Sequence, residues 1–526
     1  MAAHVESRRA ERPDLDRAGT EPGDSRRSAL VPGAAAALFV MLALISCVGR
    51  ANVLLNSDGD LARHLRVGSY ILARHALFYQ DVFSYTMLGK PFVPYEWLSE
   101  VLYTVANLAG GLAGVAVLAS LVIAATYALV TGFLVARSVD PLLAFSVGAL
   151  AAASGALHWL ARPHLFSALG AILTLIVLDN PSRRRLWPIV PIFILWANLH
   201  GGFLFGLVLI GVYVVGDLAE VWLARGPARD PWRQRASFHL KALGLALASC
   251  LVNPSGLGLF SHVTGYLGQR YLVDHTQEYA SPNFHLFSTQ IFIGVLLLTI
   301  ATFALGKQRP SLPRLLLVGV DLAFALYSVR NIPLFAVTAL PLVALELDPT
   351  WRELLTAPNL LAKPVRAMSE RFARGERHGG NWGWPVAISL FLAFAAASHG
   401  TVAGVSVIDA RFLATRFPVA AVQRARAAGL AGRMYNEFTW GGYILYAWPE
   451  QKVFIDGQTD FYGAALTETY DQIADLDPGW RDALRKWNVS LVIIPTDSRL
   501  ADELEHDPGW SVWYRDQTAV ILQRNG

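Results

Sequence analysis

Charged residues are scarce in this chain of 526 residues. Only 16% of the residues are charged, whereas 54% are hydrophobic and the mean hydropathy is +0.39. Soluble globular proteins carry about 25% charged residues. The composition therefore excludes an ordinary soluble enzyme and predicts a protein with several membrane-spanning helices.

Cysteines and familiar catalytic motifs are also lacking. Cys47 and Cys250 both lie inside apolar runs and have no Cys-x-x-Cys spacing, so neither a disulfide framework nor a zinc site is indicated. The sequence has no Gly-rich phosphate loop, Ser-His-Asp signature or HExxH motif, which argues against nucleotide-driven transport, serine hydrolysis and zinc proteolysis. The net charge of +4 comes from short loops rather than from a basic, aromatic-rich face, so nucleic acid is not an expected partner.

Long apolar runs are what the sequence does have. A helix crosses a bilayer in about 20 residues, and runs near that length or longer lie at 31–49, 115–136, 141–160, 164–180, 186–223, 239–253, 288–306, 312–348 and 384–404. The runs at 186–223 and 312–348 are too long for one span, and NLHGG and RNIP interrupt them. Each counts as two spans, so residues 30–404 are predicted to form a membrane domain of about eleven helices.

The charges of the loops predict the topology. Residues 1–29 are polar and too acidic for a signal peptide, which predicts a disordered cytoplasmic tail. The loops NPSRRR, ARGPARDPWRQR, GKQRPSLPR and RAMSERFARGERH are rich in Arg and Lys, as expected on the cytoplasmic side. An odd number of spans then places residues 405–526 outside.

The segment 405–526 reads as a soluble α/β domain. Helices are predicted at 418–429, 464–475, 478–487 and 498–505, and strands at GRMYNEF, GYILYAW, KVFIDG and VSLVIIP, followed by the hairpin WSVWYRDQTAVILQ. Residues 50–98 form a long first outer loop. It contains the amphipathic helix LARHLRVGSYILARH and a second amphipathic helix near Trp97, both expected at the membrane interface.

Unusual polar residues collect on the predicted outer side. They are Asp58, Asp60, His64, Asp81, Glu96, Glu100, Arg162, His164, Asn198, His200, Asn253, Glu278, Asn283, His285, Arg330 and Asn331. Any one of them could be an interfacial loop residue in contact with water and lipid headgroups. Ionisable groups are costly at membrane depth, so a whole set on one side favours a shared water-filled cavity.

Four motifs together resemble the GT-C class of glycosyltransferases, integral membrane enzymes that take a sugar from a polyprenyl-phosphate carrier. The motifs are DGDLARHLRVGSYIL, DVFSYTMLGKPFVPYEWLSEVLY, NLHGGF and GGYILYAWPEQKVFIDGQTDFYG. They are similar to a group of bacterial membrane proteins of this class whose first loop reads Asp-Pro-Asp, two aromatic residues, His-Leu and a glycine. Here Gly59 stands in place of the proline and Ala62–Arg63 in place of the aromatic pair, while both aspartates and His64 are kept.

The resemblance implies an inverting glycosyltransferase in a bacterial cytoplasmic (inner) membrane, with a GT-C-like membrane domain and an outer, periplasmic α/β domain. In that class an acid of the first outer loop is the usual base, which deprotonates the acceptor as it attacks the anomeric carbon. Asp58 or Asp60 fits this role. We favour Asp58, with Asp60 assisting it or with both binding a divalent cation such as Mg²⁺ or Mn²⁺. The alternative is a glycine-centred turn capped by Asp.

The departing phosphate needs cations and hydrogen-bond donors. Candidates for binding the substrate and its phosphate are His64, Glu96, Arg162, His164, His200, Glu278 and Arg330. The cations among them could instead snorkel or pair with a carboxylate. Asp456 and Asp460 in FIDGQTDFYG read as turn caps, with acceptor binding as the alternative.

The partners implied are a polyprenyl-phosphate sugar donor, an acceptor that is an envelope glycan, lipid or protein, and the lipid bilayer. Two other classes stay open. A transporter or flippase would be expected to show internal repeats and polar groups near mid-membrane in both halves. A non-catalytic envelope scaffold would tolerate the loss of both Asp58 and Asp60.

Overall fold

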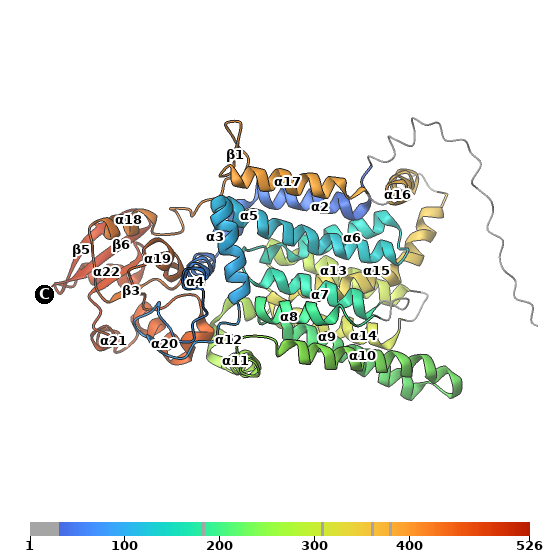
Figure 1. Cartoon of the computed structure of the whole chain (residues 1–526), viewed down its shortest axis with the longest axis horizontal. Helices are drawn as coiled ribbons and strands as arrows, with labels where there is room; N and C mark the ends of the chain where they lie inside the picture. The colour runs from blue at the N-terminus through green and yellow to red at the C-terminus, as the bar shows by residue number, and fades with distance from the viewer. Residues whose placement is uncertain (1–30, 180–184, 307–309, 359–361, 378–380, 526) are drawn as a thin grey trace, which may run out of the picture.

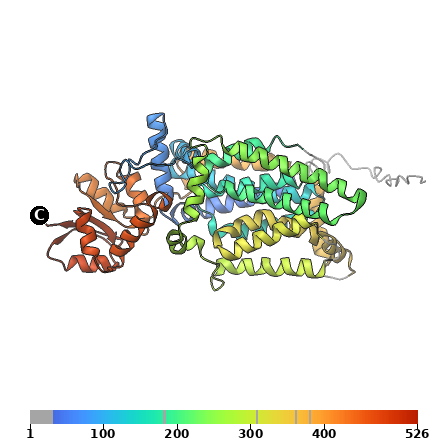
Figure 2. The same ribbon diagram turned by 90° about the horizontal axis from the view of Figure 1, so that it is seen from below.

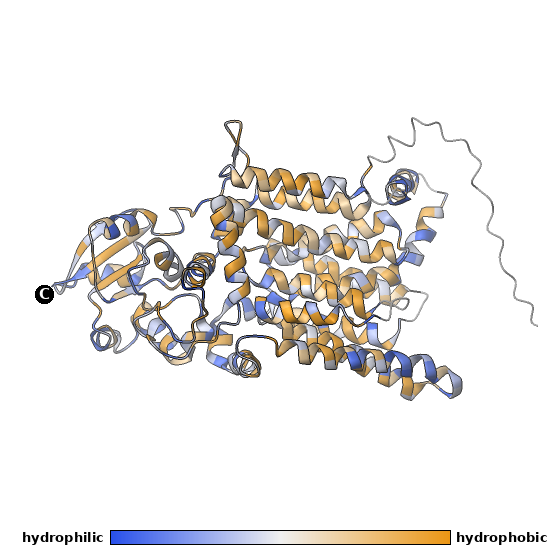
Figure 3. Ribbon diagram, in the orientation of Figure 1, coloured by the Kyte–Doolittle hydropathy of each residue, from blue (hydrophilic) through white to orange (hydrophobic). Residues whose placement is uncertain are grey.

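A helical bundle and an α/β part make up the described chain. The computed structural model describes residues 31–179, 185–306, 310–358, 362–377 and 381–525, so the tail predicted at 1–29 lies outside the described residues. The α/β part sits at one end of the elongated bundle (Figures 1 and 2). Apolar residues dominate the bundle between its ends, and hydrophilic residues concentrate at both ends (Figure 3).

Mostly apolar helices build the bundle, and at least one of them overlaps each of the predicted runs. They are α2 (Ala34–Leu44, continued by the π-helix η1, Ile45–Gly49), α5 (Trp97–Ala136), α6 (Pro141–Gly155), α7 (His164–Leu178), α8 (Ile189–Leu199), α9 (Phe203–Leu223), α10 (Arg229–Cys250), α13 (Phe287–Leu305), α14 (Leu312–Tyr327), α15 (Ile332–Thr356) and α17 (Gly383–Ala397). Among the described residues, five helices are long and apolar enough to cross a membrane, and four shorter apolar helices accompany them. The chain is a membrane protein, and the count of about eleven spans stays a prediction.

Both long apolar runs break at the predicted places. His200, whose backbone is extended (φ −165°), separates α8 from α9. Ser328 (φ −144°) separates α14 from the turn η5 (Val329–Asn331), and Pro333 lies in the first turn of α15, where its missing N–H is not needed. Asn198 accepts a 2.8 Å hydrogen bond from the indole N–H of Trp97, which ties the first break to α5.

Short helices lie between the bundle and the α/β part (Figure 1): α3 (Ala51–Asn56), α4 (Asp60–Arg74), α11 (Gly258–Leu267), α12 (Arg270–His275) and the turn η4 (Gln277–Tyr279). The predicted first amphipathic helix is α4. The second is the beginning of α5, which kinks at Gly110–Gly111. Gly111 has φ +59° and ψ −155°, a conformation that only glycine adopts easily.

The α/β part contains a four-stranded sheet of order β3-β4-β6-β5, in which β3 and β4 are parallel and the other pairs antiparallel. Its strands are β3 (Met434–Asn436), β4 (Leu491–Pro495), β5 (Trp510–Arg515) and β6 (Ala519–Arg524), and its helices are α18 (Val419–Ala427), α19 (Gly441–Ala447), α20 (Thr459–Ala474), α21 (Trp480–Lys486) and α22 (Arg499–Glu505). The two-stranded hairpin β1–β2 (Thr401–Val402, Val405–Ser406) precedes it. At the far end of the bundle, α16 (Ala362–Arg377) crosses the other helices (Figure 1).

Two strand predictions in this part are wrong. GYILYAW forms the helix α19, and KVFIDG is irregular apart from a single bridge between Val453 and Ser84. Tyr443, Ile444 and Leu445 of α19 are all buried. A short run that is apolar all round gives no alternation by which a strand could be told from a buried helix.

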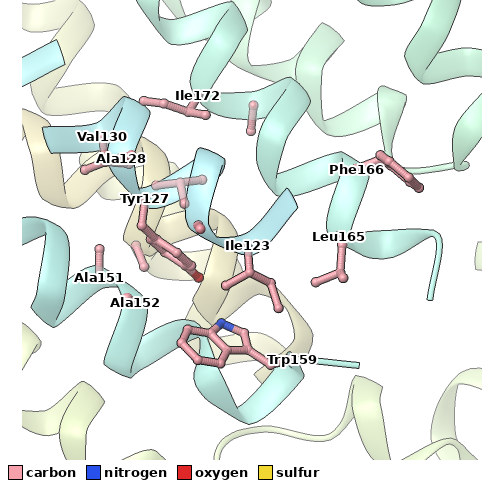
Figure 4. Close-up of a cluster of buried hydrophobic side chains, with 14 of the residues drawn as sticks. Ile123, Tyr127, Ala128, Val130, Ala151, Ala152, Trp159, Leu165, Phe166 and Ile172 are labelled. Carbon is pink, nitrogen blue, oxygen red and sulfur yellow. The ribbon is translucent and has the colours of Figure 1, made fainter. Parts of the chain in front are cut away.

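The apolar core of the bundle reaches the end that faces the α/β part. Ile123, Tyr127, Trp159 and Leu165 belong to one cluster there (Figure 4). The same side chains line a cavity between the bundle and the α/β part. Because close-packed cores resist displacement, this cluster gives the cavity a rigid base.

Polar residues also collect at the opposite end of the bundle, contrary to the expectation that they gather on one side. Asp179 pairs with Arg137 at 2.9 Å and with Arg314 at 3.0 Å. Asp217 lies 2.6 Å from His239, and both are fully buried. Each of these side chains therefore has an ionisable partner inside the bundle, which lowers the cost of burying its charge.

We expect Gly68→Ala to destabilise the contact between α4 and α5. The new Cβ would lie 2.2 Å from both the carbonyl oxygen of Glu100 and the hydroxyl oxygen of Thr104, and such overpacking costs about 1–3 kcal/mol. The Tm of the purified protein in detergent, followed by tryptophan fluorescence, should fall by several degrees.

Gly132→Ala is the matched control on α5. Its new Cβ would meet only the Cβ of Ala35, at an ordinary 3.9 Å, so the Tm should stay the same or rise slightly. Equal Tm values for the Gly68 variant and the wild type would contradict the packing argument.

Candidate active site

A cavity of about 1350 Å³ opens between the bundle and the α/β part. Its walls come from α4, α5, α7, α9, α11, α12, the α14–α15 break and the loops before α19 and α20. All nine site residues predicted from the sequence line it: Asp58, Asp60, His64, Glu96, Arg162, His164, His200, Glu278 and Arg330. The fold therefore brings together residues that are spread over most of the chain.

The Asp-Gly-Asp turn packs directly against the α/β part. Asp58 Oδ1 accepts a hydrogen bond from the backbone N–H of Asp60 at 3.1 Å, at the start of α4. A Cβ on Gly59 would lie 1.8 Å from the carbonyl oxygen of Thr439, and one on Gly457 would lie 1.8 Å from Asp60 Oδ1. The turn therefore needs glycine on both sides of the contact, and Asp58 does act partly as a turn cap.

Three carboxylates converge on the guanidinium of Arg162. Its Nη1 lies 3.0 Å from Asp58 Oδ2 and 2.8 Å from Glu278 Oε1, and its Nη2 lies 2.5 Å from Asp60 Oδ2. The three acids come from the loop before α4, from the first residue of α4 and from η4. Among the contacts that the structure shows, Asp60 Oδ1 accepts no hydrogen bond.

Asp60 and Glu278 have very different pKa values in this arrangement. Burial raises the pKa of Asp60 to about 6, the charge of Asp58 adding to the rise and Arg162 opposing it. Burial also acts to raise the pKa of Glu278, but Arg162 and Arg330 outweigh it and hold that pKa at about 2. Near neutral pH Asp60 is therefore a poised proton acceptor, and Glu278 is a permanent anion.

A second charged cluster joins α4 to α5 and to the α/β part. Arg63, which is 4% exposed, lies 3.1 Å from Asp456 and 3.5 Å from Glu100, and also contacts Gln458. His64 Nδ1 lies 3.5 Å from the same Glu100 oxygen. Burial alone would lower the pKa of His64, but the neighbouring carboxylates raise it overall.

Asp456 is thus more than the turn cap expected from the sequence. It accepts the backbone N–H of Gln458 and the hydroxyl of Tyr462, each at 3.0 Å, and it also carries the ion pair with Arg63. Nothing in the sequence indicated this role for Arg63, because Asp456 is far from it along the chain and only the fold brings the two together.

Glu96 and His200 face each other across the cavity wall. His200 Nδ1 accepts hydrogen bonds from the Ser167 hydroxyl at 2.7 Å and from the Gly202 N–H at 3.1 Å. The proton of the neutral ring is then on Nε2, which lies 3.7 Å from Glu96. Burial raises the pKa of Glu96 to about 7.

Arg330 presents a guanidinium without a carboxylate partner. In the part of the chain that the structure describes, no carboxylate lies within ion-pair distance of it, and it stacks over the ring of Tyr279 at 4.5 Å. His200, whose Nε2 carries the ring proton, lines the same cavity, whereas the ring N–H of His164 is donated to the carbonyl oxygen of His158 at 2.7 Å. A guanidinium matches the oxygens of a phosphate.

Several cavity residues were not predicted from the sequence. His262 lies 2.8 Å from Asp460, and the Tyr271 hydroxyl donates to Asp471 at 2.7 Å, so α11 and α12 are tied to α20. His262 and Tyr266, four residues apart on α11, both line the cavity. That helical spacing of polar aromatic residues is a signal that could have been found.

Apolar side chains extend the cavity between the helices of the bundle. They come from α5, α7, α9, α14 and α15 and are Ile123, Leu165, Leu204, Phe205, Val208, Phe324 and Leu334. The cavity thus has a charged part beside the α/β domain and an apolar part inside the bundle. This division suits a ligand with a polar head and a hydrocarbon tail.

A shared metal site does not form from the predicted residues. Among the described residues, no three or more His, Cys, Asp or Glu side chains are placed to hold one ion. Asp58 and Asp60 direct their Oδ2 atoms to Arg162 instead. The residues present therefore do not fit the divalent cation expected between them.

Comparison with known proteins places the fold. No family model and no curated protein matches the chain. The apo oligosaccharyltransferase of Archaeoglobus fulgidus is similar, with a TM-score of 0.54, 13% identity and coverage of 90% of this chain and 69% of that one.

Two further structures of the Archaeoglobus fulgidus enzyme agree with the first. AglB in complex with an inhibitory peptide and a dolichol-phosphate has a TM-score of 0.55 at 13% identity, covering 94% of this chain and 73% of that one. The enzyme tethered to an acceptor peptide with the NVT sequon has a TM-score of 0.53 at 13% identity, covering 95% and 74%. AglB is a GT-C glycosyltransferase, and the chain has a GT-C-like fold.

Proposed function

We propose that the protein is a membrane glycosyltransferase that moves a sugar from a polyprenyl-phosphate donor to an acceptor inside this cavity. One observation carries the proposal. Among the described residues, a single cavity combines the half-buried carboxylate of Asp60, the guanidinium of Arg330, which has no carboxylate within ion-pair distance, and an apolar extension between helices. These parts match the acceptor, the phosphate and the lipid of such a donor.

The reaction is a single displacement at the anomeric carbon. The acceptor oxygen or nitrogen forms a bond to that carbon, and the bond between the carbon and the phosphate oxygen breaks. The acceptor's proton goes to a carboxylate, and the phosphate leaves with the electron pair. One displacement inverts the anomeric configuration.

Asp60 is the stronger candidate for the base. Both oxygens of Asp58 are engaged, one by the N–H of Asp60 and the other by Arg162. Asp60 Oδ1 lies beside Gly457 and accepts no hydrogen bond from the described residues, and its pKa of about 6 suits a base that works near neutral pH. The contacts therefore favour Asp60 as the base, whereas the sequence alone favoured Asp58.

In this proposal the phosphate lies beside the guanidinium of Arg330 and the Nε2–H of His200, with the polyprenyl chain in the apolar extension. Preorganised donors of this kind stabilise the charge that develops on a leaving oxygen. The solved structure of AglB with a dolichol-phosphate supports a lipid-linked donor.

The acceptor enters from the side of the α/β domain, where Gly457 and Asp460 face the cavity. AglB has been solved with an acceptor peptide, and for this chain the acceptor class is an envelope glycan, lipid or protein. We assign the cavity and residues 405–526 to the outer face of a bacterial cytoplasmic membrane, in keeping with the Arg-rich segments 224–235 and 366–377 at the other end of the bundle (Figure 1).

Loss of the base should abolish transfer. Membranes holding equal amounts of wild type, Asp58→Asn, Asp60→Asn or the control Asp230→Asn are given radiolabelled polyprenyl-phosphate sugars, and label in envelope material is counted. Asp60→Asn should lower transfer at least about 100-fold. Asp58→Asn should lower it less, since Asp58 only holds the turn and Arg162.

Asp230 is an exposed residue of α10, and its exposed side chain pairs with Arg233, so its variant should match the wild type. Full transfer by both Asp58→Asn and Asp60→Asn would contradict the assignment and favour a scaffold. No transfer by the wild type with any donor pool would overturn the proposed function itself.

The pH profile should report the ionisation of Asp60. A base must be deprotonated, so kcat/KM should fall tenfold per pH unit once the pH drops below the pKa of about 6. Asp60→Asn has no such group, and its residual activity should show no fall in that range. If the acidic limb persisted unchanged in Asp60→Asn, the titrating base would be another group.

A further inference from the structure

Arg162 occupies the point where three carboxylates of the cavity meet. Its guanidinium contacts Asp58, Asp60 and Glu278 at 2.5–3.0 Å. Three acids around one cation carry an excess of negative charge. Without Arg162 their like charges would repel one another strongly at this depth.

The protein backbone fixes the position of Arg162. The hydroxyl of Tyr103, on α5, donates a 2.9 Å hydrogen bond to the carbonyl oxygen of Arg162. The N–H of the preceding Ala161, which is fully buried, donates to Leu54 of α3 at 2.9 Å. The guanidinium is therefore held against the acids by the fold, and it does not merely reach them from a flexible surface loop.

The same three acids are the ligand type that Mg²⁺ or Mn²⁺ would use. A divalent cation of this kind needs oxygens at about 2.0–2.2 Å around one point, in near-octahedral geometry. Here each acid has one oxygen at hydrogen-bond distance from the guanidinium of Arg162. The oxygens of Asp58 and Glu278 contact Nη1, and that of Asp60 contacts Nη2. No three metal-ligating side chains in the described ranges share an ion position.

We propose that the guanidinium of Arg162 is the resident cation of Asp58, Asp60 and Glu278, and that sugar transfer by this protein needs no divalent metal. The inference rests on the proposed function. Arg162 takes no part in bond making. It holds Asp58 and Asp60 side by side as the acceptor's proton passes to Asp60, and it is a positioning residue.

Metal binding tests the proposal without any substrate. The full chain in detergent is titrated with Mn²⁺, and the loss of the free Mn²⁺ signal in electron paramagnetic resonance measures binding. The wild type should bind no Mn²⁺ at micromolar concentrations. Arg162→Ala uncovers the three carboxylates and should gain one Mn²⁺ site. The double variant Arg162→Ala/Glu278→Gln lacks one of the carboxylate ligands, so it should bind Mn²⁺ at least about tenfold more weakly than Arg162→Ala.

Arg330→Ala is the matched control. It removes a guanidinium from the same cavity, but the structure shows no carboxylate within ion-pair distance of Arg330 in its described part, so no Mn²⁺ site should appear. Arg162→Lys keeps a positive charge and should also exclude Mn²⁺. If Arg162→Ala fails to fold, as judged by gel filtration and Tm, Arg162→Lys replaces it as the test variant. Stoichiometric Mn²⁺ binding by the wild type, lost in Asp60→Asn, would overturn the proposal.

Activity adds a second arm. Transfer by the wild type should be the same in excess EDTA as in Mg²⁺ or Mn²⁺. Loss of transfer in EDTA that either metal restores would overturn the proposal but leave the proposed function standing. If the wild type transfers no sugar under any of these conditions, the proposed function fails, and the Mn²⁺ titration still decides which cation the carboxylates hold.

Discussion

The buried guanidinium of Arg63 is the interaction on which the geometry of the cavity depends. It bridges Glu100 of α5 and Asp456 of the α/β part from its place on α4. Removing one partner from a buried ion pair costs roughly 3–5 kcal/mol, because the other charge is left without compensation. The three segments are therefore held in fixed relative positions. Asp60, one helical turn before Arg63, lies at the same junction.

Close backbone contact completes this junction. A Cβ on Gly59 would meet the carbonyl oxygen of Thr439, and one on Gly442 would lie 2.6 Å from the carbonyl oxygen of Gly59. The motifs DGDLARHL and GGYILYAWPEQKVFIDGQ are far apart in the sequence, but they form the two sides of one contact. The glycine at position 59 follows from this packing, since a side chain there would push the α/β part away from the carboxylates.

The residues that line the cavity could be predicted from the sequence, but most of their contacts could not. The breaks at His200 and Arg330 could be found because the polar residues of NLHGG and RNIP interrupt apolar runs that are too long for one span. All nine candidate residues line the cavity, since charge in an apolar chain needs a shared polar environment. The choice between Asp58 and Asp60 could not be predicted. It depends on a turn hydrogen bond and on Gly457, which only tertiary structure brings next to Asp60.

Arg162 and Arg330 differ in what they can still bind, and the proposed position of the phosphate follows from this difference. Three carboxylates surround Arg162, so a phosphate there would meet more negative than positive charge. Arg330 offers its guanidinium at the α14–α15 break, beside the apolar part of the cavity. A lipid phosphate therefore gains most at Arg330, where its tail can also leave water. Under the proposed function, the anomeric carbon is expected between Arg330 and Asp60, with the acceptor on the side of Gly457.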